Sequence, residues 1–142
     1  MSQTVKIKKT SLYNQHLELQ AKMVSFAGYL MPISYSKIQD EYYAVRNRCG
    51  IFDVSHMGQL FIKGSDQLTI DLETIFPTDL KNISLNQSKY SFLMNEDAGI
   101  YDDLIVTKID GGFNIILNAA CKETDFEILK KLLKNKYEMK LS

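Results

Sequence analysis

The feature that most constrains the fold is a pair of apolar, β-rich runs joined by a very short turn. The runs are Asp103–Ile109 (DLIVTKI) and Phe113–Asn118 (FNIILN), separated by Asp110-Gly111-Gly112. β-Branched residues favour strands, and an Asp-Gly pair supplies the positive φ of a tight turn. The stretch therefore predicts a β-hairpin. Both runs are apolar at nearly every position, which predicts a sheet covered on both faces, at least in part.

Residues 37–48 show the 3.6-residue period of an amphipathic helix. The apolar stripe at spacing i, i+4, i+7 consists of Ile38, Tyr42 and Val45. Ser36 can cap the start of this helix, and Gly50 lies just past its end. Residues 51–64 follow as extended chain.

Two further helices and a strand are predicted downstream. Ser65 caps a helix over residues 66–76, which Pro77 ends. Its predicted buried residues are Leu68, Leu72, Ile75 and Phe76. Residues 89–94 (KYSFLM) predict a strand. The last helix spans about residues 122–134 and is expected to bury Phe126, Leu129, Leu132 and Leu133. Helices and strands interleave without a strict βαβ rhythm, so the predicted class is α+β, with a mixed or antiparallel sheet and packed helices.

Length and charge place the chain among ordinary globular proteins. Its 142 residues suit one domain, and 17 basic residues balance 17 acidic ones. A balanced chain has no general attraction to nucleic acid or to an acidic membrane surface. The basic start (KIKKT) is interpreted as part of a loose tail over residues 1–10. Cys49 and Cys121 lack metal or disulfide spacing and are interpreted as reduced thiols of a cytoplasmic protein.

Ser55 and His56 stand side by side, which suggests a nucleophile and a base. Neighbours in an extended chain point to opposite faces, so the pair cannot form a catalytic hydrogen bond. Asp53 and His56 lack the further ligands that a zinc site needs, and His16 lies far away in the sequence. We therefore interpret His56 as structural and predict no metal.

The acidic stretch Asn95–Asp103 (NEDAGIYDD) contains the strongest candidates for chemistry. Its first half has the composition of a solvated turn. Asp102 and Asp103 differ because they open an apolar strand, and alternation sends one of the two inward. A carboxylate that faces a covered site must be hydrogen-bonded, paired or protonated. Alternation alone does not decide which of the two faces inward.

Four segments together resemble a known family. They are MVSFAGYLMPISY (23–35), EYYAVRNRCGIFDVSHMGQLFIKG (41–64), KYSFLMNEDAGIYDDLIVTK (89–108) and FNIILNAACKETD (113–125). In order and over most of the chain, they resemble the aminomethyltransferase, or T-protein, of the glycine cleavage system. The resemblance implies the N-terminal part of the folate-binding fold of that family, over residues 11–136, with a C-terminal end at 137–142.

The resemblance also implies a reaction and a site. Members of the family move the methylene of an aminomethyl group from a lipoyl carrier protein, the H-protein, to tetrahydrofolate and release ammonia. The second acid of the DD pair is the functional aspartate, which is Asp103 here. The other residues implied to contact the folate are Met57, Phe61, Tyr90, Ile105 and Asn118. The family often has glycine where this chain has Ala98.

Family members continue well beyond residue 142. The resemblance therefore implies a partial protein, inactive or weakly folate-binding by itself, that self-associates through apolar surface. Two other functions stay open: a non-catalytic folate-binding scaffold of the related iron–sulfur-assembly type, and a stand-alone domain that docks the lipoyl carrier protein.

Overall fold

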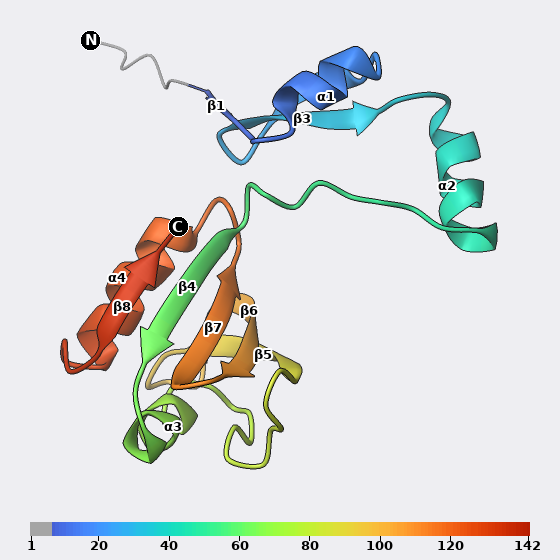
Figure 1. Ribbon diagram of the computed structural model, residues 1–142. Coiled ribbons are helices and arrows are strands. Elements are labelled where there is room, and N and C mark those ends of the chain that lie inside the picture. Colours follow the sequence, from blue (N-terminus) through green and yellow to red (C-terminus); the bar gives the residue numbers. More distant parts are fainter. Residues whose placement is uncertain (1–6) are drawn as a thin grey trace, which may run out of the picture. The chain divides into compact units, whose positions relative to one another are not determined.

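The computed structural model describes residues 7–142, which divide into two compact units (Figure 1). The first ends at His56 and the second runs from Met57 to Ser142. Residues 1–6 of the predicted tail over residues 1–10 lie outside the described residues. In the rest of that segment, Lys8–Lys9 form strand β1. Both units mix helices and strands, so the predicted α+β class is confirmed.

The described part of the first unit holds a small sheet in the order β1-β3-β2. Strands β2 (Lys22–Phe26) and β3 (Tyr29–Ser34) pair as an antiparallel hairpin, and β1 pairs in parallel with β3. The hairpin turn consists of Ala27 and Gly28, whose φ values of 48° and 79° are those of a primed turn. Helix α1 (Tyr13–Glu18) connects β1 to β2.

Helix α2 (Ile38–Asn47) lies where the sequence predicts a helix, but its start is built differently. Ser36 does not cap it. Instead, the Glu41 carboxylate accepts hydrogen bonds from the main-chain N–H groups of Tyr35 and Ser36 and from the Ser36 hydroxyl. These bonds hold the pKa of Glu41 below its usual range, with the main-chain bond from Ser36 as the largest cause. The carboxylate thus fixes the two residues before the helix, and the helix itself has no side-chain cap.

The second unit is built on a five-stranded antiparallel sheet in the order β5-β6-β7-β4-β8 (Figure 1). Its strands are β4 (Gly58–Lys63), β5 (Ser88–Met94), β6 (Ile100–Ile109), β7 (Gly112–Leu117) and β8 (Glu138–Leu141). Helices α3 (Asp66–Glu73) and α4 (Lys122–Leu132) add their apolar residues to one core with the sheet. The predicted hairpin is confirmed as β6 and β7, joined through Asp110 and Gly111.

The core residues of this unit follow the sequence periods closely. Each strand sends alternate residues inward, as Leu60 and Ile62 do from β4. All four predicted residues of the 66–76 segment are buried, although α3 itself ends at Glu73 and Ser65 makes no side-chain cap. In the last helix, Leu129 and Leu133 are buried as predicted. The prediction for Leu132 is wrong: it is 37% exposed, and Asp125 at 2% exposure occupies an inward position instead.

Within the second unit, the opposite face of the five-stranded sheet is less covered than the core face. Tyr90 is 60% exposed and Ile105 is 42% exposed, whereas Leu104 and Val106 beside Ile105 are buried. The prediction of a sheet covered on both faces, at least in part, is met only partly on this side: Phe92, Asn114 and Ile116 are half-buried, whereas Tyr90 and Ile105 are exposed. The residues that the resemblance implies for folate binding gather on the open side.

Candidate functional site

Asp103 lies in β6, directly opposite Phe92 of β5. In the next row of the same face, Tyr90, Ile105 and Ile116 are direct cross-strand neighbours. Side chains alternate between the two faces of a strand, so Asp103, Ile105 and Tyr90 share the open face. The Asp103 side chain is half-buried there.

Asn118 fixes the position of the two aspartates. It follows β7, and its side-chain nitrogen Nδ2 donates to Asp103 Oδ1 at 3.1 Å and to Asp102 Oδ1 at 3.0 Å. The same nitrogen lies 3.1 Å from the main-chain oxygen of Asp103. Carboxylate oxygens only accept hydrogen bonds, so the amide must turn its nitrogen toward them. The oxygen of the amide is therefore not the atom that faces the two carboxylates.

The environment of Asp103 also acts on Tyr90. Burial raises the pKa of the Tyr90 hydroxyl, and the charge of Asp103 and hydrogen bonding with it raise this pKa further. The tyrosine is therefore a neutral hydroxyl beside an acceptor. A carboxylate, a phenol and an amide thus converge on one patch of an otherwise apolar face, as in sites that orient a polar heterocycle.

Met57 and Phe61 lie at different distances from this group. Met57 directly precedes β4, where the pairing of Gly58 with Leu117 continues toward Asn118. Phe61 pairs with Asn114 and Lys140, two rows farther along the sheet, since Asn114 is four residues from Asn118. Four residues of strand span about 14 Å. The structure thus brings Tyr90, Asp103, Ile105 and Asn118 together, with Met57 next to them and Phe61 outside the group.

Asp102 faces the other side of β6, toward α4. There its neighbour is Asp125, whose pKa is raised to about 7 by burial first, and then by hydrogen bonding with Asp102 and by its charge. Burial and the charge of Asp102 likewise raise the pKa of the Cys121 thiol. Sequence reasoning missed Asp125. It lies four residues before Leu129 and eight before Leu133, on the stripe that the helical period sends inward.

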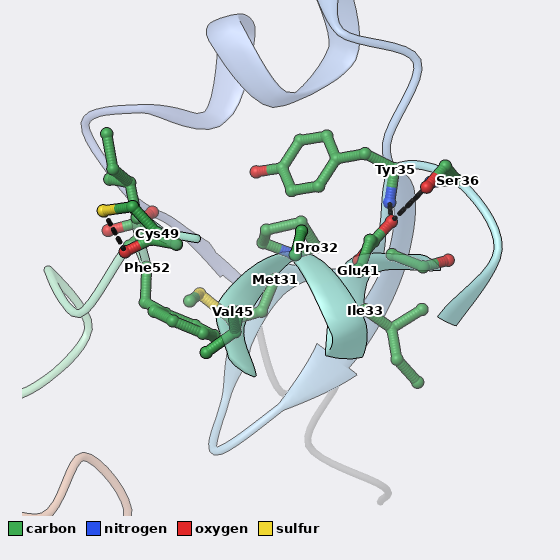
Figure 2. Close-up of a pocket in the computed structure, with 14 residues that line it drawn as sticks. Met31, Pro32, Ile33, Tyr35, Ser36, Glu41, Val45, Cys49 and Phe52 are labelled. Carbon is green, nitrogen blue, oxygen red and sulfur yellow. Dashed lines mark hydrogen bonds between the residues drawn. The ribbon is translucent and has the colours of Figure 1, made fainter. Parts of the chain in front are cut away.

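Tyr90, Asp103 and Asn118 line none of five well-formed cavities of the described residues. One of these cavities, of about 310 Å³, lies within the first unit (Figure 2). Met31, Pro32, Val45 and Phe52 form its apolar lining, and Glu41 reaches across to Tyr35 and Ser36 at one side.

A buried polar cluster near this cavity was not foreseen from the sequence. His16 Nε2 donates to Asp53 Oδ2 at 2.7 Å, and the Tyr35 hydroxyl lies 2.7 Å from His16 Nδ1. In the sequence, 37 residues separate His16 from Asp53, and the fold of the first unit brings them together. Burial by itself would raise the pKa of Asp53, but the hydrogen bonds from Ser55 and His16 outweigh it and hold the pKa far below its usual range.

Replacement of Asp53 by asparagine is expected to destabilise the first unit at neutral pH by about 2 kcal/mol, the usual worth of hydrogen bonds to a buried charge. A carboxyl with a lowered folded-state pKa stabilises the fold above its unfolded pKa of about 4, and the contribution is lost as the pH falls below that value. The difference between the two proteins should therefore shrink between pH 5 and pH 2. Urea titrations read from amide signals of residues 7–56 measure it, with Asp97→Asn in an exposed turn as the charge-matched control. A constant difference at every pH would contradict this account.

Ser55 and His56 form no catalytic pair, although the reason differs from the one that the sequence suggested. They lie in a turn and not in a strand. The Ser55 hydroxyl donates to Asp53 Oδ1, while the His56 ring packs edge-on against Phe26 and Tyr29. Among residues 7–142, no three His, Cys, Asp or Glu side chains come together as metal ligands.

No helix within residues 7–142 has both the length and the apolar character needed to span a membrane.

Comparison with known proteins gives a consistent result. Residues 12–142 match the family model described as the GCVT N-terminal domain. The chain is 42% identical over 127 residues to an aminomethyltransferase of Thermosipho melanesiensis and 43% identical over 131 residues to one of Thermotoga neapolitana. These alignments cover 89% and 91% of this chain but only 35% and 36% of the relatives.

Among solved structures, the chain is similar to the glycine cleavage system aminomethyltransferase T of Bartonella henselae. The TM-score is 0.79 at 33% identity, over 95% of this chain and 37% of that one. The chain thus spans about a third of the length of its relatives, and the match to the family model runs from Leu12 to the last residue given. On this evidence, the chain belongs to the GCVT N-terminal domain family.

Proposed function

We propose that this chain carries the tetrahydrofolate-contacting part of an aminomethyltransferase of the glycine cleavage system. The observation that carries the proposal is the arrangement around Asp103: a half-buried carboxylate held by the Asn118 amide, on an open face beside Tyr90 and Ile105. The names of the relatives support the reaction class.

In the proposed reaction, the reduced pterin lies against the open face of the β5–β6–β7 strands. A nitrogen of tetrahydrofolate attacks the methylene carbon of an aminomethyl group carried on a lipoyl sulfur, and the bond from that carbon to ammonia breaks. A second folate nitrogen then bonds to the same carbon as its bond to sulfur breaks, and the two protons lost from the folate nitrogens end on the ammonia and on the thiol. Positive charge develops on the reacting atoms, and a fixed carboxylate at Asp103 stabilises it and holds the nitrogen in line. The products are methylenetetrahydrofolate, ammonia and the dihydrolipoyl carrier protein.

The other residues have supporting parts in this proposal. The Asn118 amide keeps the Asp103 carboxylate in place and offers its oxygen to a donor of the pterin ring. Ile105 and Met57 supply apolar contact. Tyr90 supplies an aromatic ring that can stack on the pterin while its hydroxyl points toward the carboxylate. Because most of this face is open in the chain by itself, we expect weak binding of the folate here.

A titration of the isotope-labelled chain with 5-formyltetrahydrofolate, a stable reduced folate, tests the proposal. The amide signals of Tyr90, Asp103 and Ile105 should shift progressively with ligand concentration. Asp97→Asn, a charge change at the exposed turn of the same hairpin, should leave this binding intact. Signals of the open face that stay in place up to the solubility limit of the ligand would speak against a folate site on these residues.

A further inference from the structure

The two carboxyl groups of Asp102 and Asp125 form a buried pair directly behind the proposed folate face. Asp125 is only 2% exposed, and Asp102 is its hydrogen-bonding and charged neighbour. The Oδ2 atoms of both residues are buried, and neither has a hydrogen-bond partner among the described residues. Two ionised carboxylates could only accept hydrogen bonds, so the two neighbouring groups can satisfy one another only when one proton lies between them.

The pair is connected to the open face by a single amide. Asp102 Oδ1 accepts from Asn118 Nδ2 at 3.0 Å, and the same nitrogen donates to Asp103 Oδ1 at 3.1 Å. The chain of contacts therefore runs from Asp125 through Asp102 and Asn118 to Asp103. Only Asp103 and Asn118 belong to the proposed folate-contacting set, and Asp125 lies on the far side of the sheet, in α4.

The charged and titratable groups around Asp125 favour a protonated state. Strand β6 contributes Asp102, and the connection between β7 and α4 contributes Cys121. On its own helix the neighbour is Lys122, which is 8% exposed and packs against Gly58 of β4. The acidic neighbours oppose a further negative charge at Asp125, and its burial does so too.

We propose that Asp125 is a positioning residue: as the protonated partner of Asp102, it fixes the Asn118 amide and thereby holds Asp103 in place for the folate. The inference rests on the proposed function. While the proton is present, Asp125 donates to the Asp102 carboxylate, which stays in place to accept from Asn118. When Asp125 ionises, two like charges face one another in a buried space, and Asp102 must move away from Asn118.

The pair gives reduced-folate binding a specific pH dependence. Only the form with a protonated Asp125 presents an ordered Asp103, so the apparent affinity falls in proportion to the fraction of that form. With a midpoint near 7, 5-formyltetrahydrofolate should bind about tenfold more weakly at pH 8 than at pH 6. In Asp125→Asn, the amide donates to Asp102 at every pH, so binding should persist and its dependence on pH should largely disappear.

Two measurements on the whole chain keep the inference separate from the proposed function. The first follows the side-chain NH₂ signals of Asn118 from pH 6 to pH 8 without ligand. Their chemical shifts should change with pH, with a midpoint near pH 7, in the original protein. They should stay constant in Asp125→Asn and in Asp102→Asn. The second is the folate titration at each pH, with Asp125→Ala added as the variant that cannot donate; it should bind weakly throughout.

The possible outcomes distinguish a failure of the positioning role from a failure of the proposed function. If Asn118 titrates as expected but no reduced folate binds at any pH, the proposed function fails while the coupling between Asp125 and Asn118 stands. If the Asn118 signals are constant across the range in the original protein, or if Asp125→Ala binds folate as tightly and with the same pH profile, the positioning role is overturned. If Asp125 were purely structural, Asp125→Ala would lower stability. Folate binding would then show no such pH profile in the original protein, and Asp125→Asn would have no profile to remove.

Discussion

Replacement of Asp103 by asparagine is expected to lower the rate of aminomethyl transfer to tetrahydrofolate by two to three orders of magnitude. Asparagine keeps the shape of the side chain and can still contact Asn118, but it removes the negative charge that stabilises the developing positive charge of the reaction. Loss of one preorganised electrostatic partner costs about 3 kcal/mol of transition-state stabilisation in comparable sites. The effect should appear mainly in kcat, because the charge acts on the transition state more than on the bound substrate.

The measurement uses the two thirds of a relative's length that this chain does not span. A chimera in which this chain replaces the matching region of the Thermosipho melanesiensis aminomethyltransferase provides it, because the two sequences align over 127 residues at 42% identity. Ammonia release with an aminomethyl-loaded lipoyl carrier protein gives the rate. Asp97→Asn in the same chimera is the matched control and should retain the full rate. An active chimera whose rate is unchanged by Asp103→Asn would exclude the catalytic role and favour a folate-binding scaffold.

Replacement of Gly112 by alanine is expected to destabilise the second unit by 3 kcal/mol or more, at the upper end of the costs of overpacking. A Cβ atom at this position would lie 2.0 Å from the main-chain oxygen of Ile62 in β4. That oxygen belongs to the backbone of the central strand pair, where Gly112 lies opposite Lys63. The clash can be relieved only by separating β4 from β7, which carry much of the core. Urea unfolding followed by amide signals of residues 57–142 measures the loss.

Gly111→Ala is the matched control for this prediction. Gly111 is the adjacent turn residue, and an added Cβ would meet no atom within 4 Å. Its φ of 71° is left-handed, so alanine should cost only about 1 kcal/mol. Equal losses at the two positions would show that backbone conformation, and not the close approach of β7 to β4, decides the requirement for glycine at position 112.

Much of the second unit could be predicted from local patterns. The β6–β7 hairpin follows from two β-rich runs around Asp110-Gly111, and helix α4 follows from its apolar period. The turn before β6 was also foreseen: Asn95 Oδ1 accepts from the N–H groups of Asp97 and Gly99 there. Ala98, where the family often has glycine, adopts a φ of 61° in this turn. Each of these features depends on residues a few positions apart, so the sequence displays them directly.

Several other elements went unpredicted because their local signals are weak. The turn of the β2–β3 hairpin is Ala27-Gly28, which has no Asn or Asp to mark it. Strand β8 has only four residues and is defined by its pairing with β4, 75 or more residues away. For helix α2 the period was correct, but its stripe of Ile38, Tyr42 and Val45 remains exposed. Periodicity predicts a helix and its apolar face, and it cannot say what covers that face.

The sequence by itself determined the α+β class, the central hairpin and the presence of two aspartates at the start of an apolar strand. The tertiary structure decided what each aspartate faces: Asp103 the open side with Tyr90 and Asn118, and Asp102 the buried side with Asp125, 23 positions away. It also joined His16 to Asp53 across 37 residues. The physical reason is that the alternation of side chains along a strand only places neighbouring residues on opposite faces of the sheet. The burial and charge that set the chemistry of each face come from segments that only the fold brings close.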